Sequence, residues 1–409
     1  MRHVLILVSA TQLMSTEIRQ LIDYRNDRDA SLKLIDWFDV ERVRAARILV
    51  IGAGAIGNEV LKNLALLGIG HVFILDRDTI EMSNLSRSVL YRASDNGKDK
   101  VEVAARAVRE LNPVVNTTSQ KGDVTLDVGL GLLRSMDVVI GCVDNNQARL
   151  YINRACWKVG KPWIDAGIGQ LNGQVRVFVP GNGACYECSL SEEQFEEMRI
   201  PCNLLASRYE NEGKIPTTPT IASIMGAVQA QEALKLLDAS RWEGRTLGGR
   251  EFLFNGTVGE ASVVSLPVKQ DCFAHSTLDF SKLIELKETR AANTTAAELL
   301  NIARQHLNDE AVIVLNFELC VEMRCPNCHQ STRMLRPERK IYREELACDQ
   351  CGRDRYLVTT HTLGGTQTEY EEDFLDTKLS DLGIPSLEIL EARGQHGVSV
   401  YLELSGDLR

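Results

Sequence analysis

A glycine-rich turn in the first third of the chain has the spacing of a nucleotide-binding loop. Gly52, Gly54 and Gly57 follow the apolar run RILVI and precede a helical pattern. Glycines at these positions permit a tight turn and let backbone N–H groups approach phosphate oxygens. Asp76 closes the next apolar run, where a carboxylate can accept hydrogen bonds from ribose hydroxyls. By itself this pattern is shared by many nucleotide binders, and its conventional interpretation is a dinucleotide-dependent dehydrogenase.

The segment that follows Asp76 carries groups that suit a triphosphate. In the stretch DRDTIEMSNLSR, which contains Asp78, the amide of Asn84 and the guanidinium of Arg87 lie three positions apart. Lys100 begins the next helical pattern and can add an ammonium group. A dehydrogenase has no evident use for these groups, whereas a leaving pyrophosphate needs donors and cations that match its charge. The segment therefore favours ATP over a dinucleotide.

A further carboxylate, Asp144, follows the apolar run DVVIG in the sequence CVDN. If this run is a strand of a parallel sheet, Asp144 lies at the carboxyl edge, where ligands bind in open α/β folds. Carboxylate oxygens are preferred ligands of Mg²⁺. We therefore expect Asp144 to complete a Mg-ATP site with the glycine loop.

Four cysteines near the C-terminal end have the spacing of a zinc ribbon. They form two C-x-x-C pairs, Cys325 with Cys328 and Cys348 with Cys351. This pattern is a strong zinc signal on spacing alone. Four protein ligands leave no open position for water, so we expect a structural metal ion rather than a catalytic one.

A second candidate zinc site is less certain from spacing. Cys185 and Cys188 form another pair, and Cys272 with His275 could complete a tetrahedral set across a long intervening segment. Without further support, Cys272 fits a buried apolar thiol and His275 fits a surface residue equally well. If four ligands do assemble, this site is also structural.

Taken in order, these motifs form a combination that we can match to a family. The glycine loop, the stretch D-x-D-x-I-E-x-S-N-L-x-R, the helix-opening lysine and C-V-D-N span roughly residues 47 to 275. In this combination the sequence resembles the ThiF/MoeB/HesA-type enzymes that activate ubiquitin-like and sulfur-carrier proteins. Ser88 stands where many members have glutamine, which is a minor departure. The resemblance implies ribose binding by Asp76, phosphate binding by Asn84, Arg87 and Lys100, and Mg²⁺ binding by Asp144.

The resemblance also supports the second zinc site and implies a homodimer. Members of the family link the same two places with a C-x-x-C pair each, and His275 replaces the fourth cysteine with an acceptable ligand. Members often borrow an N-terminal arginine from the dimer partner to contact the γ-phosphate. Arg25 and Arg28 lie in the corresponding region, although a solvated surface position is the simpler interpretation of either.

A polar loop without metal spacing contains a candidate nucleophile. Cys202 lies in the sequence RIPCN, upstream of the helix start IPTTPT. Members of the family that form a thioester have a cysteine shortly before such a start. The resemblance thus implies that Cys202 displaces AMP from an acyl adenylate and holds the acyl group as a thioester. The alternative is an unreactive loop cysteine in an enzyme that only adenylates.

The element pattern predicts a doubly wound α/β fold. From Arg47 to about Trp242, short apolar runs alternate with helical segments, most clearly at 57–67, 98–111 and 221–237. Residues 251–267 read as antiparallel strands, because their turns leave no room for crossover helices. We expect a helical N-terminal extension at 1–45 and a Rossmann-like mixed sheet at 46–275. A separate zinc-ribbon domain at 276–409 would begin with a charged helix and an apolar strand near 311–320.

Composition restricts the possible partners. A net charge of −10 without a basic run argues against nucleic acid. The apolar runs are far shorter than the roughly 18 residues of a membrane span, and the N-terminal run is too short for a secretion signal. Cysteines in metal-type pairs indicate a reducing, cytoplasmic location. Cys142, Cys156 and Cys320 lie in apolar contexts and fit core packing.

Together these patterns rank the possible functions. The first is adenylation of a ubiquitin-like β-grasp protein by ATP, thioester formation on Cys202 and transfer to a conjugating enzyme. The second is adenylation of a sulfur-carrier protein without a thioester. A non-catalytic zinc scaffold and a dehydrogenase follow, in that order.

Overall fold

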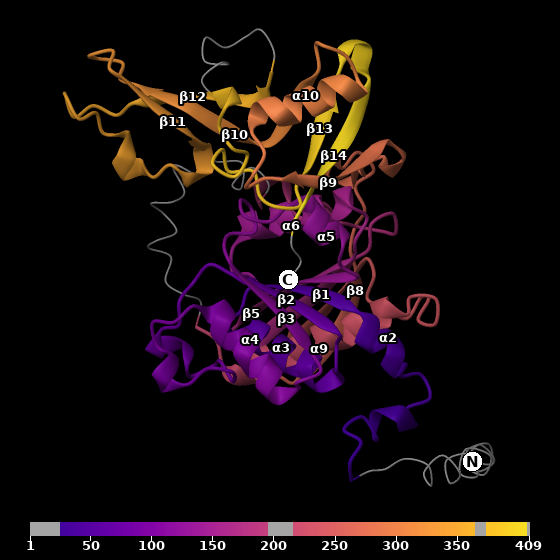
Figure 1. Ribbon diagram of the computed structural model, residues 1–409. Helices are drawn as coiled ribbons and strands as arrows, with labels where there is room; N and C mark the ends of the chain where they lie inside the picture. The colour runs from indigo at the N-terminus through magenta and orange to yellow at the C-terminus, as the bar shows by residue number, and fades with distance from the viewer. Residues whose placement is uncertain (1–24, 195–215, 365–373, 407–409) are drawn as a thin grey trace, which may run out of the picture.

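The strand that leads into the glycine loop lies inside an eight-stranded mixed sheet (Figure 1). The computed structural model describes residues 25–194, 216–364 and 374–406. Five strands pair in parallel and three join them antiparallel, as the sequence predicted. In spatial order they are β3 (Asn116–Lys121), β2 (His71–Asp76), β1 (Arg47–Ile51), β4 (Val138–Gly141), β5 (Trp163–Gly169), β6 (Asn172–Phe178), β7 (Arg250–Asn255) and β8 (Glu260–Ser265).

Helices cover both faces of this sheet, as expected for a doubly wound fold. The three longest predicted helical patterns are confirmed with boundaries shifted by a few residues. One face is covered by α3 (Ala55–Leu67), α4 (Lys100–Leu111) and α9 (Pro219–Leu237), and the other by α5 (Leu130–Arg134) and α6 (Asn146–Lys158).

The alternation of side chains in β1 explains why two cores form. Ile48 and Val50 point into the core that contains α3, α4 and α9. Leu49 and Ile51 point into the core that contains α5 and α6. Successive side chains of a strand point to opposite faces, so a strand with a helix layer on each side is apolar throughout.

The C-terminal module has a six-stranded sheet and a core of its own. Its first strand was not expected, because the charged sequence LIELKETR fits a helix as well as a strand. The apolar strand predicted near 311–320 is confirmed and extends further. The elements are β9 (Leu283–Arg290), α10 (Ala296–His306), β10 (Val312–Arg324), β11 (Ser331–Pro337), β12 (Tyr356–Leu363), β13 (Ile389–Arg393) and β14 (Ser399–Ser405).

This module lies against α5 and α6 rather than apart from them (Figure 1). The backbone N–H of Gly131 donates to the carbonyl of Leu387 over 2.7 Å. Arg134 forms ion pairs with Glu285 and Glu403. Glycine is required at 131, because a Cβ there would lie 2.6 Å from the oxygen of Leu387. The two bodies are therefore in direct backbone contact.

The N-terminal region is described only from residue 25. A short 3-10 helix (Leu32–Leu34) and α2 (Val40–Ala45) precede β1, and Asp39 caps α2 by accepting from the N–H of Arg42. Residues 1–24 lie outside the described residues, so a helical extension there stays a prediction.

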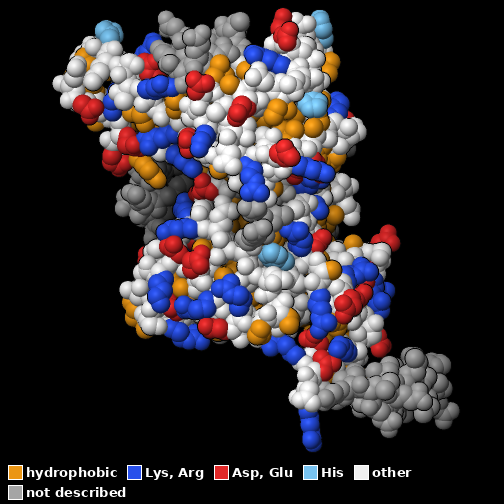
Figure 2. All heavy atoms as spheres, in the orientation of Figure 1, with side chains coloured by type: hydrophobic (Ala, Val, Ile, Leu, Met, Phe, Trp, Pro, Cys, Tyr) orange, Lys and Arg blue, Asp and Glu red, His pale blue; other side chains and the backbone are white. Residues whose placement is uncertain are grey.

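Charged side chains of both signs are interspersed over the face in Figure 2. Within the described parts of the chain, no helix has the length and apolar character needed to cross a membrane.

Candidate functional site

The glycine loop links β1 to α3 at the carboxyl edge of the sheet. Gly52 has φ +96°, and a Cβ there would lie 2.5 Å from the carbonyl oxygen of Cys142. A Cβ on Gly57 would lie 2.0 Å from the oxygen of Gly52. Gly54 differs, because its Cβ would meet no atom within 4 Å. Two glycines are thus needed for packing, and the third faces open space at the uncapped start of α3, where an anion can approach.

Two buried side chains that the sequence did not single out hold this loop. Asn58 donates to the carbonyls of Ala53 and Gly54 over 2.7 and 2.9 Å, and it accepts from the N–H of Leu90. The hydroxyl of Tyr91 donates to Ala53 over 2.6 Å. Burial raises the pKa of Tyr91, so its proton stays in place. The loop is therefore preorganised, although an asparagine within an apolar helix carries no sequence signal of this role.

Asp76 lies at the end of β2 beside the loop. Its Oδ2 accepts from the N–H of Ala53 over 2.6 Å, and its Oδ1 accepts from the N–H of Asp78 over 2.8 Å. Burial raises the pKa of Asp76, although the nearby Lys100 opposes the shift. Both oxygens are oriented by backbone groups, as a ribose-binding carboxylate requires.

Lys100 at the start of α4 faces the segment after β2. Its ammonium pairs with Asp78 over 2.8 Å, and its backbone N–H donates to the Asp78 carbonyl. The Lys100 side chain is 11% exposed, whereas that of Asp78 is 55% exposed. A mostly buried ammonium with a single exposed partner can exchange that partner for a phosphate.

Asn84 and Arg87 share one turn. Asn84 is buried and accepts from the N–H of Glu81, and Arg87 donates to the carbonyl of Ser83 over 3.0 Å. The backbone of Ile80 pairs with that of Lys98, which joins this segment to the start of α4. The structure thus connects Asn84 and Arg87 to the element that carries Lys100. Their contact with phosphate stays a prediction.

The loop between β4 and α6 carries Asp144, which is exposed. Asn145 caps α6 by accepting from the N–H of Ala148 over 2.8 Å. The side chain of Arg149 donates to the carbonyl of Val143 over 2.8 Å, which holds the loop in place. The Asp144 carboxylate is of the type that Mg²⁺ prefers, and it lies beside the glycine loop because β4 pairs with β1.

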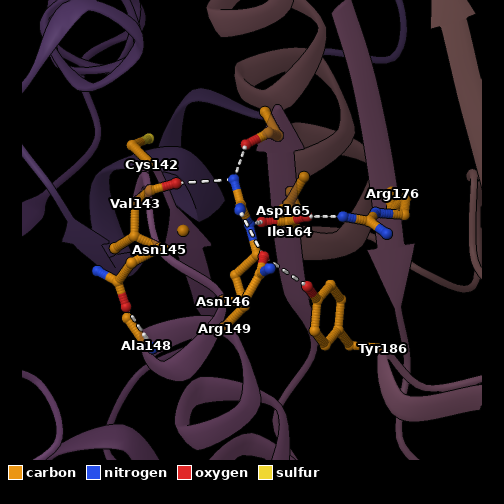
Figure 3. Close-up of polar contacts among 12 residues, drawn as sticks. Cys142, Val143, Asn145, Asn146, Ala148, Arg149, Ile164, Asp165, Arg176 and Tyr186 are labelled. Atoms are coloured by element: carbon orange, nitrogen blue, oxygen red, sulfur yellow. Dashed lines mark hydrogen bonds and ion pairs between the residues drawn. The ribbon is translucent and has the colours of Figure 1, made fainter. Parts of the chain in front are cut away.

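A buried charge network supports this loop, and the sequence reasoning missed it. Asp165 accepts from Arg149 over 2.9 Å and from Arg176 over 2.6 Å (Figure 3). Burial alone would raise the pKa of Asp165, but the two guanidinium groups lower it below its usual value. Asp165 therefore remains ionised. The only signal in the sequence is an aspartate directly after the apolar run PWI.

A polar cavity of about 490 Å³ opens next to this network. Arg149, Arg176, Tyr186 and Glu251 contribute to its lining, from the start of α6 and from β6, β7 and the turn that follows β6. Arg176 also stacks on the Tyr186 ring, with the guanidinium carbon 4.8 Å from the ring centroid. The cavity can accept an extended polar segment beside the Asp144 loop.

Both predicted metal-ligand groups assemble in the structure. In each group the four candidate ligand atoms lie within 4.8 Å of one another. The contacts between ligand atoms include 3.6 Å for Cys185 and Cys272, and 3.3 Å for Cys188 and His275. Tetrahedral zinc with Zn–S bonds of about 2.3 Å places its ligands at similar separations. The indole of Trp157 stacks on His275 and orients its ring.

The C-terminal group has the same geometry. The Sγ atoms of Cys325 and Cys351 are 3.4 Å apart, and those of Cys328 and Cys348 are 3.5 Å apart. The pairs lie in the turns after β10 and before β12. Four protein ligands in each group fit closed, structural sites.

The remaining residues that the sequence singled out are cysteines and arginines outside the two metal-ligand groups. Cys156 and Cys320 are buried and Cys142 is partly buried, and burial raises the pKa of all three thiols, as expected for packing residues. Cys202 lies outside the described residues, so its role stays a prediction. Arg25 and Arg28 are exposed, and nothing tests a contact with ATP from a dimer partner.

The family model for the ThiF family matches residues 26–272. The sulfur carrier protein adenylyltransferase of Thermus thermophilus is 34% identical over 236 residues, which cover 56% of this chain and 82% of that protein. SUMO-activating enzyme subunit 2 of Dictyostelium discoideum is 40% identical over 149 residues, which cover 36% of this chain and 22% of that protein.

Other relatives are matched over only part of their length. Mouse adenylyltransferase and sulfurtransferase MOCS3 is 32% identical, with coverage of 56% of this chain and 48% of that protein. This chain therefore spans about half or less of both the mouse and the Dictyostelium relatives. The crystal structure of MccB from E. coli has a TM-score of 0.52 at 22% identity and covers 61% of this chain and 74% of that chain. That likeness concerns the fold alone.

Proposed function

This chain belongs to the ThiF family, and on that premise we propose that it is an ATP-dependent adenylyltransferase for the C-terminal carboxylate of a ubiquitin-like or sulfur-carrier protein. The observation that carries the proposal is the meeting of three loops at one sheet edge. They follow β1, β2 and β4, which are neighbours in the sheet. These loops hold the glycines, Asp76 and Asp144.

Each side chain has a role that its surroundings support. Asp76 holds the ribose, and the start of α3 with Lys100 binds the phosphates. The substrate carboxylate attacks the α-phosphorus, an acyl adenylate forms, and pyrophosphate leaves. Lys100, Arg87 and Asn84 stabilise the charge of the leaving group. Asp144 would hold Mg²⁺, which would neutralise part of the phosphate charge.

The polar cavity beside the Asp144 loop is the proposed path for the end of the protein substrate. Its lining combines Arg176 with Glu251, whose pKa is raised by burial. Such a surface can pair with backbone amides and polar side chains of an extended chain. The two structural zinc ions would hold the elements around the cavity and within the C-terminal module.

The fate of the adenylate separates two versions of this function. In one, the thiolate of Cys202 displaces AMP, and the acyl group passes as a thioester to a conjugating enzyme. In the other, a sulfur-carrier protein is released for sulfide delivery by another protein. The SUMO-activating relative supports the first version, and the sulfur carrier protein adenylyltransferase supports the second. A homodimer in a reducing, cytoplasmic environment is part of either proposal.

ATP–pyrophosphate exchange with candidate ubiquitin-like and sulfur-carrier proteins tests the proposal. Lys100→Ala should lower exchange by about a hundredfold or more, because it removes a cation from the leaving group. Lys98→Ala is the matched control, since Lys98 lies two positions away and pairs with Asp95 instead. Lys98→Ala should exchange like the wild type.

A non-reducing gel of wild type and Cys202→Ala then separates the two versions. Exchange with a thiol-sensitive adduct that Cys202→Ala abolishes supports thioester transfer. Exchange without an adduct supports adenylation alone. If no candidate supports exchange, the non-catalytic zinc scaffold becomes the favoured function. Preferential binding of NAD over Mg-ATP would instead favour a dehydrogenase.

A further inference from the structure

A short segment connects the C-terminal module with the sheet edge that is proposed to bind the nucleotide. Residues 122–131, here called the collar, follow β3 and include the first two residues of α5. At its first end, the N–H of Gly122 donates to the carbonyl of Asp76 over 3.1 Å. At its far end, Leu130 and Gly131 donate to Glu388 and Leu387 of the module. The collar therefore lies between the ribose-binding strand and the module.

A lysine of the module holds the middle of the collar. Lys340 donates to Oδ1 of Asp127 over 2.8 Å, and Oδ2 of Asp127 accepts from the N–H of Asp123 over 2.8 Å. Asp123 in turn accepts from Arg77 over 3.2 Å. Arg77 is the residue between Asp76 and Asp78. A continuous series of contacts thus runs from Lys340 of the module to Arg77, the residue between the two carboxylates proposed to face the nucleotide.

Close packing and hydrogen bonds hold the backbone around Asp127. Gly122 packs so closely on Asp127 that a Cβ would lie 2.9 Å from the Cβ of Asp127. Gln120 donates to the carbonyl of Asp127 over 2.6 Å, which positions its backbone but not its carboxylate. The side chain of Asp127 is oriented by Lys340 from one side and by Asp123 from the other.

We propose that Lys340 is a positioning residue for nucleotide binding, acting through Asp127 and the collar on Asp76 and Arg77. The inference rests on the proposed use of ATP. Without the lysine, the Asp127 side chain keeps only its hydrogen bond from the N–H of Asp123, so the collar and the end of β2 sample more orientations. Nucleotide binding must then order these segments, and the free energy that the ordering costs lowers the affinity. The C-terminal module would thereby complete the ribose end of the site.

Calorimetric titration of the full chain with Mg-ATP and, separately, with AMP tests this inference. Lys340→Ala should weaken both ligands by the same factor, about three- to tenfold. AMP has the ribose of ATP but lacks the pyrophosphate leaving group. An equal loss of affinity for Mg-ATP and AMP therefore places the effect at Asp76 and Arg77. Lys340→Arg, which keeps the donor, should bind within about twofold of the wild type.

Two controls separate positioning from a general loss of structure. Lys282→Ala removes a lysine of the same module that pairs with Asp279, and it should bind like the wild type. In an Asp127→Ala background, Lys340→Ala should have no further effect, because its partner is gone. Hydrogen exchange at Gly122 and Asp123 should accelerate in Lys340→Ala while α3 keeps its protection.

The outcomes distinguish this inference from the proposed function. If the wild type binds Mg-ATP and Lys340→Ala binds it equally well, Lys340 is not a positioning residue and only this inference fails. If the wild type binds neither nucleotide, the proposed function fails and this inference fails with it. A loss in Lys340→Ala that persists in the Asp127→Ala background also overturns the path through the collar.

Discussion

Gly54 and Gly57 lie in the same loop but meet different surroundings. A Cβ at 57 would lie 2.0 Å from the oxygen of Gly52, whereas a Cβ at 54 would meet nothing within 4 Å. The backbone at Gly54 has φ −76°, which alanine can adopt. Packing therefore explains Gly57. At Gly54, close approach of a ligand to the backbone is the reason that remains.

The first prediction compares these two positions. Gly57→Ala should lower the free energy of unfolding by about 1–3 kcal/mol, because the loop backbone must move to avoid the methyl group. Gly54→Ala should cost less than about 1 kcal/mol, since only the helix cap changes. It should nevertheless weaken Mg-ATP binding, because the methyl group occupies the space proposed for phosphate. Urea unfolding and calorimetric titration measure the two effects, and undiminished binding by Gly54→Ala would place the phosphates elsewhere.

Single residues show which roles a sequence can reveal. Gly52, Asp76 and Lys100 belong to linear motifs, so their meeting at one edge was predictable once β1, β2 and α4 were recognised. Asn58 could not be found in this way, because its partners include Leu90, which is distant in the sequence. The same holds for Asp165, whose two arginine partners are brought together only by the fold.

At the scale of elements, the pattern of apolar residues predicted the strands that are buried on both faces. Strands with helices on both faces, such as β1, are continuous apolar runs and were predicted. The edge strand β3 was missed, because NTTSQK has no apolar face to bury. β9 was missed because the charged sequence LIELKETR is half exposed and does not distinguish a strand from a helix.

The two ligand groups join segments that are distant from one another in the sequence. Cys185 and Cys272 are 87 positions apart in the sequence, and their group joins the turn after β6 to the segment after β8. The C-terminal group closes the hairpin-like extension between β10 and β12. Metal binding at such junctions contributes directly to folding stability.

The second prediction is that each chain carries two zinc ions with separable effects. Cys272→Ser and Cys351→Ser should each lower the zinc content by one ion per chain, measured by mass spectrometry of the metal. Cys272→Ser should also lower the unfolding temperature, because it disconnects the two halves of its group. Cys320→Ala is the control, because this buried thiol belongs to neither group and should leave both ions. Retention of two ions in either serine variant would contradict the assigned ligands.

At the scale of the whole molecule, a buried carboxyl group lies where the two bodies meet. Glu388 precedes β13, is 3% exposed, and accepts from the N–H groups of Leu130 and Ile389 over 3.2 and 2.9 Å. Its neighbour Ile389 enters the core beneath α5 and α6. Burial raises the pKa of Glu388 to about 7, although Lys158 and the backbone donors oppose the shift. We therefore expect the contact between the bodies to depend on pH.

The third prediction follows from the sign of this shift. Between its ordinary pKa of 4.5 and about 7, Glu388 keeps its proton in the folded chain but loses it in the unfolded chain. The folded state then binds more protons, so stability falls as the pH rises through this window, by on the order of 3 kcal/mol, and levels off above it. Glu388→Gln keeps the accepting oxygen without ionising, so this fall should be absent and the variant should exceed the wild type in stability at pH 8.

Urea unfolding at several pH values from 5 to 8 measures this difference directly. Glu391→Gln is the matched control, because Glu391 lies three positions further along, in β13, and pairs with Arg393 instead. Its stability should follow the wild-type profile across the window. If Glu388→Gln shows the same fall as the wild type, the pH dependence arises elsewhere. If the fall disappears, proton binding at Glu388 accounts for the pH dependence of the stability across this window.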